Sequence, residues 1–188
     1  MRLSTIMNHF QIVLAAIVLY IAATSLIGWR LLHRDKTGTP PRDLALWLSL
    51  GGLLLHSLLL YDDIFSQPGL NLAFFNALAL TSWMVIVLFL VSSLTKPVEN
   101  LGILLLPVAA LTLLLEASFP SPNVMRQEVG WDIKIHVLLS MLAYSLLTLA
   151  SVQSILLAIQ DHHLHARQPA GFLRTLPPLQ TMESLLFE

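Results

Sequence analysis

The chain has 188 residues, of which 56% are hydrophobic and 11% are charged, and its mean hydropathy is +0.76. Soluble domains carry about 25% charged residues, so this composition excludes a soluble enzyme and a disordered chain and indicates a polytopic membrane protein. The net charge of −1 offers no basic surface for nucleic acid, and the lack of cysteine excludes disulfides and thiolate metal sites.

Long charge-free runs predict five membrane-spanning segments, each an α-helix because a helix satisfies its own backbone hydrogen bonds in lipid. A span needs roughly 20 residues, since a helix rises about 1.5 Å per residue through about 30 Å of hydrocarbon. The fourth run is shorter and must borrow flanking residues to cross. No repeat or linker divides the chain, so residues 1–188 are expected to form a single integral-membrane domain, an all-α polytopic transmembrane helix bundle. The runs cover residues 10–29, 44–60, 70–94, 101–115 and 135–159.

The first run admits a second interpretation, a secretory signal peptide, because Arg2 precedes it and small residues at 22–25 lie near its far end. Its apolar stretch is longer than a typical signal core, and it ends in Gly28, Trp29 and Arg30, a pattern typical of a membrane interface. We therefore expect this segment to stay in the protein as its first span.

The basic residues predict the orientation of the bundle. Seven of the ten lie after the first, third and fifth spans, whereas three lie before the first span or between the fourth and fifth. The positive-inside rule places the seven in the cytoplasm, so the amino terminus faces outward and the carboxyl terminus inward. The seven are Arg30, Arg34, Lys36, Arg42, Lys96, Arg167 and Arg174, and the three are Arg2, Arg126 and Lys134.

Two histidines lie well inside the hydrophobic runs. His56 lies six residues before Asp62, and His136 lies four residues after Asp132. At about 1.5 Å per residue these offsets are roughly 9 and 6 Å from the outer surface, so the two imidazoles are expected at similar depth in the outer leaflet. Ionisable groups inside a membrane are candidates for function, and an interhelical hydrogen bond is the alternative explanation.

A pair of imidazoles at one depth suits haem iron, which accepts neutral imidazole as an axial ligand and can be clamped between two facing helices. Zinc needs further ligands, and no carboxylate or thiolate lies at that depth. Proton handling is another possible use of such residues. The residues alone therefore leave three interpretations of His56 and His136: a b-type haem near the outer face, proton handling, and helix packing.

Five other residues are weaker candidates for the same site. Arg126 and Lys134 are basic residues of the outer face that could pair with haem propionates, although ordinary solvation accounts for either. Trp131 and Trp83 could flank a porphyrin, but an interfacial position suits the first and helix packing the second. Asn76 lies at about the depth of the histidines and could hydrogen-bond an axial imidazole, although a packing hydrogen bond is the simpler interpretation.

The run from residue 161 to 165 holds three histidines and Asp161. His162 and His165 share a helix face, but two such ligands make a weak metal site. Imidazoles that oppose the negative end of a helix dipole explain the run equally simply. No nucleotide-binding loop, nucleophile elbow or metalloprotease pattern occurs in the chain, so we expect no enzymatic activity.

Four blocks stand out in the sequence, residues 53–57, 70–83, 135–144 and 176–187. They resemble the cytochrome c assembly superfamily and occur in that family's order. Within it the chain is most similar to the YpjD-like branch of bacterial inner-membrane proteins, which is related to HemX and to the haem-handling subunit CcsA. The resemblance implies a multi-pass inner-membrane protein that binds haem in cytochrome c assembly, with His56 and His136 as the family's intramembrane histidines. It also allows a HemX-like regulatory or scaffolding protein without bound haem. The implied partners are the lipid bilayer, haem and other cytochrome c maturation proteins.

Members of the superfamily continue beyond the fourth block with further helices. Pro177 and Pro178 would end any helix that precedes them, and an apolar stripe with helical spacing follows. We therefore expect residues 176–188 to be the start of a sixth helix that is cut off at Glu188, in a chain that is a fragment or a shortened gene product.

Overall fold

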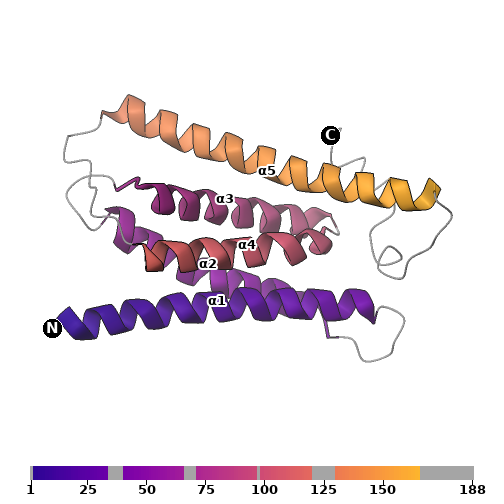
Figure 1. The fold of residues 1–188 in the computed structure, drawn as a ribbon, viewed down its shortest axis with the longest axis horizontal. Coiled ribbons are helices and arrows are strands. Elements are labelled where there is room, and N and C mark those ends of the chain that lie inside the picture. Colours follow the sequence, from indigo (N-terminus) through magenta and orange to yellow (C-terminus); the bar gives the residue numbers. More distant parts are fainter. Residues whose placement is uncertain (1, 34–39, 66–70, 97, 120–129, 166–188) are drawn as a thin grey trace.

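The computed structural model describes residues 2–33, 40–65, 71–96, 98–119 and 130–165. Over these ranges the chain forms five α-helices and one short 3₁₀ helix, with no strand. Figure 1 shows the helices lying along one another as a bundle. The predicted all-α fold is confirmed. The elements are α1 (Arg2–Leu32), α2 (Arg42–Phe65), α3 (Phe74–Thr95), η1 (Glu99–Leu101), α4 (Gly102–Ser118) and α5 (Trp131–His165).

Each of the five predicted spans corresponds to a helical stretch long and apolar enough to cross a membrane. The fourth stretch, Glu99–Ser118, reaches 20 residues because η1 and α4 follow one another directly. The helical stretch therefore extends beyond the predicted run at both ends, which is the extension that a run of 15 residues needs to cross a membrane. The predicted sixth helix, residues 176–188, lies outside the described residues.

The ends of two helices differ from the charge-free runs. α3 begins at Phe74 rather than at residue 70, and the Asn71 side-chain oxygen accepts a hydrogen bond from the Ala73 amide (3.3 Å) just before the helix. This local hydrogen bond favours a turn over helix at that point. α5 extends beyond its apolar run at both ends, because the charged residues that limit the run are compatible with helix.

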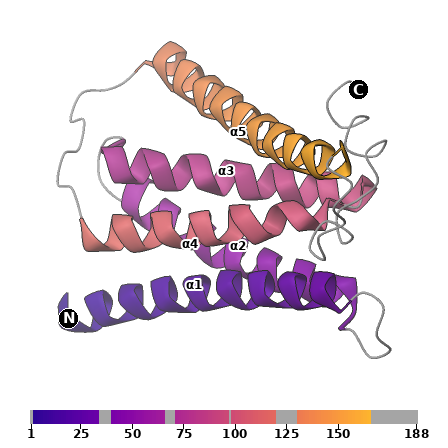
Figure 2. The same cartoon turned by 45° about the vertical axis from the view of Figure 1, so that its right-hand side comes forward.

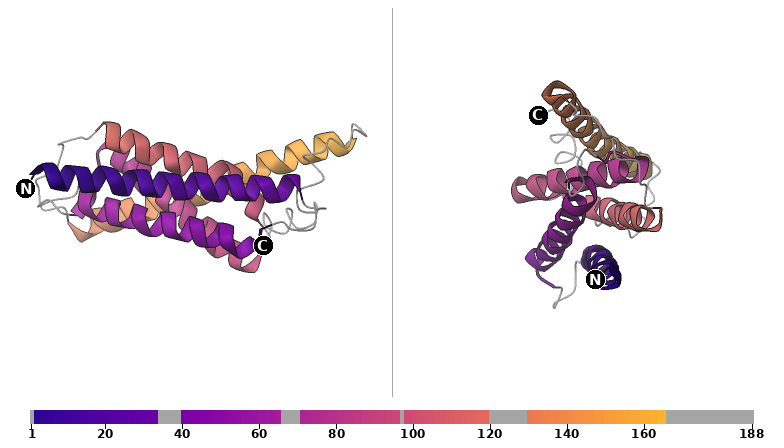
Figure 3. Two further views of the ribbon diagram at one scale, coloured as in Figure 1. Left: turned by 90° about the horizontal axis from the view of Figure 1, so that it is seen from below. Right: turned by 90° about the vertical axis from the view of Figure 1, so that its left-hand side faces the viewer.

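Successive helices alternate in direction along the bundle, as the colours in Figure 1 show. α1 packs against α2 and α4, and α3 packs against α2, α4 and α5. The end-on view in Figure 3 places α1 and α5 on opposite sides of the bundle. α5 contacts chiefly α3, and Figure 2 shows it diverging from α3 towards its Trp131 end. The bundle therefore consists of four closely packed helices, α1 to α4, with α5 attached along one side.

One face of α1 forms much of the core. Its buried residues recur every three or four positions, as expected for a helix that presents one stripe to its neighbours. Opposite this stripe, a Cβ added to Gly52 of α2 would lie 2.8 Å from the Tyr20 ring. Gly52 thus allows α1 and α2 to approach closely. The buried stripe comprises Val13, Ala16, Tyr20, Ala23 and Ile27.

An ion-pair network joins three elements at the end of the bundle where α1 ends and α2 begins. Glu99 of η1 lies 2.9 Å from the Arg30 guanidinium of α1 and 2.6 Å from Nε of Arg42 in α2. Arg42 also donates a hydrogen bond to the carbonyl of Ser93 in α3. These contacts link the ends of the four closely packed helices.

Candidate functional site

His56 lies on α2 with no exposed surface, enclosed by the packed helices. Its Nδ1 lies 3.3 Å from the hydroxyl of Tyr20 on α1, and this phenol is also fully buried. The two rings meet edge to face, with centroids 6.1 Å apart and planes at 74°. The close approach at Gly52 holds the Tyr20 ring against α2 and so places its hydroxyl near the imidazole. His56 is therefore held by a partner on a neighbouring helix.

The other ring nitrogen of His56, Nε2, is buried and makes no hydrogen bond in the structure. The carbonyl of Ala79 on α3 is near the ring. A neutral imidazole carries one N–H, so two arrangements are available. In the first, Nδ1–H donates to Tyr20 and leaves the Nε2 lone pair available to a metal. In the second, the phenol donates to Nδ1 and Nε2–H points towards Ala79. Only the first arrangement can ligate iron through Nε2.

Further side-chain hydrogen bonds link α2, α3 and α4. The indole N–H of Trp83 on α3 donates to Ser57 on α2 (2.8 Å). The hydroxyls of Ser82 on α3 and Thr112 on α4 lie 2.7 Å apart and are both buried. Interhelical hydrogen bonds of this kind stabilise membrane bundles. Trp83 therefore makes a helix-packing contact, as the simpler interpretation of its position predicted.

His136 lies in a different environment from His56. Its side chain is exposed on α5, as are those of all residues from 131 to 135 that precede it. The hydrogen bonds between α3 and α5 lie further along α5, where Thr81 donates to the sulfur of Met141 (2.9 Å) and Ser145 donates to the Thr81 carbonyl (3.3 Å). His56 lies in the second half of α2 and His136 near the start of α5, and the end of α2 and the start of α5 lie at the same end of the bundle (Figure 1). In the described part of the chain, no hydrogen bond or ring contact joins them.

The weaker candidates occupy the positions of ordinary structural residues. Asn76 is buried near the start of α3 and donates to the Asn71 carbonyl (3.3 Å), a local contact rather than one to a histidine. Trp131 begins α5 and is 79% exposed, with the Lys134 ammonium 5.1 Å from its ring centroid. Arg126 lies outside the described residues, as do the side chains of the histidines from 162 to 165.

Tyr20 is the site residue that sequence reasoning missed. Its position on the same stripe as Val13, Ala16, Ala23 and Ile27 is visible as a helical period in the sequence, and a tyrosine on a buried stripe needs a hydrogen-bond partner. That signal predicts a partner for the phenol. It does not identify His56, which lies 36 positions further along the chain.

The described residues thus form a helical protein with five stretches long and apolar enough to span a membrane. Residues 44–188 match the family described as Cytochrome C assembly protein. The chain therefore belongs to the cytochrome c assembly protein family, and this membership suggests a role in cytochrome c maturation.

Two kinds of curated relative match the chain. It is 29% identical over 181 residues to "Inner membrane protein YpjD" of Escherichia coli strain K12, an alignment that covers 93% of this chain and 65% of the relative. It is 33% identical over 115 residues to an "Uncharacterized 28.8 kDa protein in nifR3-like 5'region" of Azospirillum brasilense, covering 58% of this chain and 42% of that protein. The chain thus spans less than two thirds of these relatives. No solved structure matches it.

The similarity to YpjD and the five spanning stretches confirm the predicted location. The chain is a multi-pass protein of the bacterial inner membrane.

Proposed function

We propose that the chain is a non-enzymatic haem-handling factor in cytochrome c assembly, with His56 and His136 as axial ligands of a b-type haem near the periplasmic face. The observation that carries this proposal is the environment of His56. Its ring is wholly buried in a membrane bundle, and its Nε2 makes no hydrogen bond. Burying a polar nitrogen without a partner is costly, so such a nitrogen is a candidate for a ligand that the polypeptide does not supply.

Tyr20 gives His56 the support that a ligating histidine needs. Metal-bound histidines commonly donate their second ring N–H to a neighbouring oxygen, which fixes the tautomer and the ring orientation. The Tyr20 hydroxyl is placed to accept such a bond from Nδ1. Nε2 would then carry the lone pair for the iron. Haem bound in this way would be held and passed on rather than used for catalysis.

His136 would supply the second ligand from α5. The hydrogen bonds that join α5 to α3 involve Met141 and Ser145, which lie beyond His136 along the helix. The Trp131 end of α5 can therefore approach α3 without breaking them. Ligation of one iron by both histidines requires this approach, because in the structure His136 lies on the exposed surface of α5 whereas His56 is enclosed among the other helices.

The remaining candidates would act at the edge of the bound haem. Lys134 is exposed two residues before His136, where its ammonium could pair with a propionate, and Arg126 is the other basic candidate. Trp131 would lie beside the macrocycle at the membrane interface. Asn76 would need to exchange its hydrogen bond to Asn71 for one to an imidazole.

One observation favours a second function, that of a HemX-like regulatory or scaffolding protein without bound haem. The Tyr20–His56 hydrogen bond already joins α1 to α2, and a buried histidine used in this way needs no metal. In this alternative the phenol donates to Nδ1, and the imidazole serves only to pack the helices. Contacts with other cytochrome c maturation proteins would then carry the function.

An absorption spectrum of the purified protein after incubation with haem separates the two functions. The proposal expects the oxidised and reduced spectra of low-spin, six-coordinate haem. A correctly inserted protein that gives no low-spin spectrum would favour the scaffolding function instead.

A further inference from the structure

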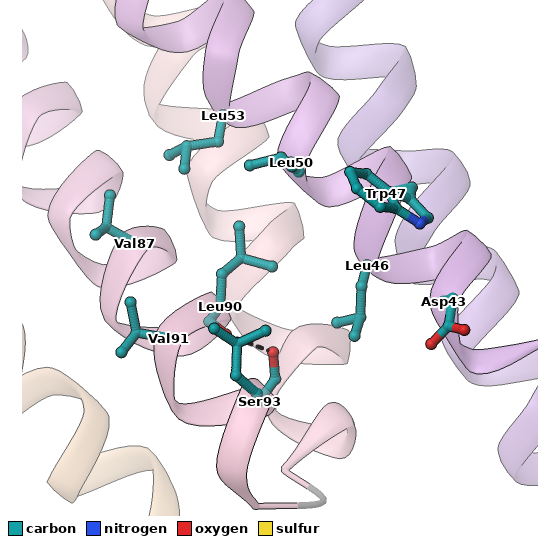
Figure 4. A pocket seen from close by; sticks show the side chains of 10 residues that line it. Asp43, Leu46, Trp47, Leu50, Leu53, Val87, Leu90, Val91 and Ser93 are labelled. Carbon is teal, nitrogen blue, oxygen red and sulfur yellow. Dashed lines mark hydrogen bonds between the residues drawn. The ribbon is translucent and has the colours of Figure 1, made fainter.

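A groove between α2 and α3 is lined mainly by aliphatic side chains and has a volume of about 490 Å³. Figure 4 shows leucines of α2 facing Val87, Leu90 and Val91 of α3. Val91 and Leu94 on its wall are 58% and 80% exposed, so the groove is open to its surroundings. Both helices are membrane-spanning stretches at this point, and the groove therefore faces lipid in the bilayer.

The length of the groove matches one leaflet. On α2 its lining runs from Asp43 to Leu53. Ten residues of helix rise about 15 Å, which is half of the roughly 30 Å hydrocarbon thickness of a bilayer. The groove therefore runs from the end of the bundle to the middle of the membrane. This length suits one acyl chain lying lengthwise, whereas a crossing helix would need a groove of twice the length.

Arg42 supplies a positive group at the end of the groove where α2 begins, which we call the mouth of the groove. Its guanidinium lies close to Glu99, and it also donates to the carbonyl of Ser93, a residue that lines the groove. The side chain is 36% exposed. A guanidinium has five N–H donors, so these contacts leave donors for a further acceptor such as a phosphate oxygen.

Asp43 supplies a negative group beside it. The Asp43 carboxylate lines the mouth and makes no hydrogen bond or ion pair with any residue that the structure describes. The indole of Trp47, one turn further along α2, is 67% exposed at the same mouth. Tryptophan is enriched at the headgroup level of membranes. The mouth thus offers a cation, an unpaired carboxylate and an interfacial aromatic ring.

These groups complement a zwitterionic headgroup. A phosphate would face Arg42 while the ammonium group faces Asp43. A primary ammonium donates N–H bonds to a carboxylate, whereas a quaternary ammonium cannot. We propose that the α2–α3 groove binds one phospholipid with an ethanolamine headgroup, one of its two acyl chains along the leucines of α2 and its headgroup between Arg42 and Asp43.

Native mass spectrometry of the full chain in detergent tests this proposal. The protein is incubated with equal amounts of phosphatidylethanolamine, phosphatidylcholine and phosphatidylglycerol that carry the same acyl chains. We expect one retained lipid, predominantly phosphatidylethanolamine. Val91→Trp would fill the groove and lower the retained fraction roughly tenfold, since overpacking such a site weakens binding. Asp43→Asn would keep a bound lipid but remove the preference for ethanolamine over choline.

Val18→Trp is the matched control. Val18 is 62% exposed on α1 and does not line the groove, so this identical substitution should leave retention unchanged. Leu50→Trp fills the groove from the opposite wall and should reproduce the loss if Val91→Trp misfolds. Three results would overturn the proposal: equal retention by wild type and both groove variants, a preference for phosphatidylglycerol, or a dimer of this chain that Val91→Trp abolishes.

Discussion

His56 combines a polar ring with complete burial, a combination that membrane proteins use where the ring has a partner or a task. Tyr20 is the partner of Nδ1, and no hydrogen bond occupies Nε2. The same residue can therefore tie α1 to α2 and still present one nitrogen to a ligand. Structural and ligating roles are compatible for this side chain, because they use different ring nitrogens.

Removing the Tyr20 hydroxyl should weaken the bundle. In Tyr20→Phe the buried Nδ1 loses its hydrogen bond, and we expect the free energy of unfolding to fall by about 1 kcal/mol, the usual order for one interhelical hydrogen bond in a membrane protein. Unfolding in detergent, followed by circular dichroism, measures the change. Tyr144→Phe is the control, because Tyr144 is 63% exposed on α5. Equal stabilities of the two variants would contradict the assigned role of Tyr20.

The sequence singles out His56 and His136 because each interrupts an apolar run, yet it cannot show their surroundings. A helix that is amphipathic reveals its buried face by its period, whereas α5 is apolar nearly all round its lipid-spanning part. The exposure of His136 was therefore not predictable. Pairing of Tyr20 with His56 depends on how α1 is rotated against α2, which no local pattern specifies.

At the scale of the elements, the close contact of α1 with α2 determines where the Tyr20 hydroxyl lies. Gly52 faces the Tyr20 ring, and the ring has no free space around it because it is fully buried. A methyl group at position 52 would push the ring away or separate the helices. The position of Tyr20 beside His56 therefore depends on glycine at this position.

Gly52→Ala should lower the free energy of unfolding by about 1–3 kcal/mol, the usual cost of overpacking a well-packed core. Thermal unfolding in detergent measures it. Gly28→Ala provides the comparison on α1, because a Cβ there meets no atom within 4 Å. That change should be neutral or slightly stabilising, since alanine favours helix over glycine. If Gly52→Ala were as stable as Gly28→Ala, the close helix contact would not be needed.

The helices themselves were predictable from charge-free runs of spanning length, because the cost of unsatisfied backbone groups in lipid leaves helix as the stable form. The residues at which the helices begin and end were less predictable. Asn71 delays α3 through a local hydrogen bond, and polar residues at both ends of α5 continue the helix beyond its apolar part. Both effects depend on short-range contacts rather than on hydropathy.

For the whole molecule, the alternating helix directions place the end of each helix and the start of the next at the same end of the bundle. The end that carries the Arg30–Glu99–Arg42 network also carries Lys96, so three of the seven basic residues on the predicted cytoplasmic side lie there in the described part of the chain. From the positive-inside rule we expect this end to face the cytoplasm, which would place the half of the bundle with His56 and His136 towards the periplasm.

Reporter fusions test this orientation. A fusion at Asn123 should show periplasmic activity and a fusion at Gln168 cytoplasmic activity, because seven of the ten basic residues lie on the side of Gln168. Alkaline phosphatase and green fluorescent protein serve as the two reporters. Periplasmic activity at Gln168 would reverse the topology and move both histidines to the cytoplasmic half.

The central claim, that His56 and His136 ligate one haem, is tested most directly by the spectra of the haem-loaded wild type and its histidine variants. We expect His56→Ala and His136→Ala each to convert the low-spin spectrum to a high-spin one or to lose the haem. The double variant should be scarcely worse than either, because ligands that act as a unit are non-additive. His33→Ala should keep the wild-type spectrum, because this half-buried histidine directly follows the last residue of α1, at the other end of the bundle from His56. A low-spin spectrum that survives in the double variant would contradict the claim.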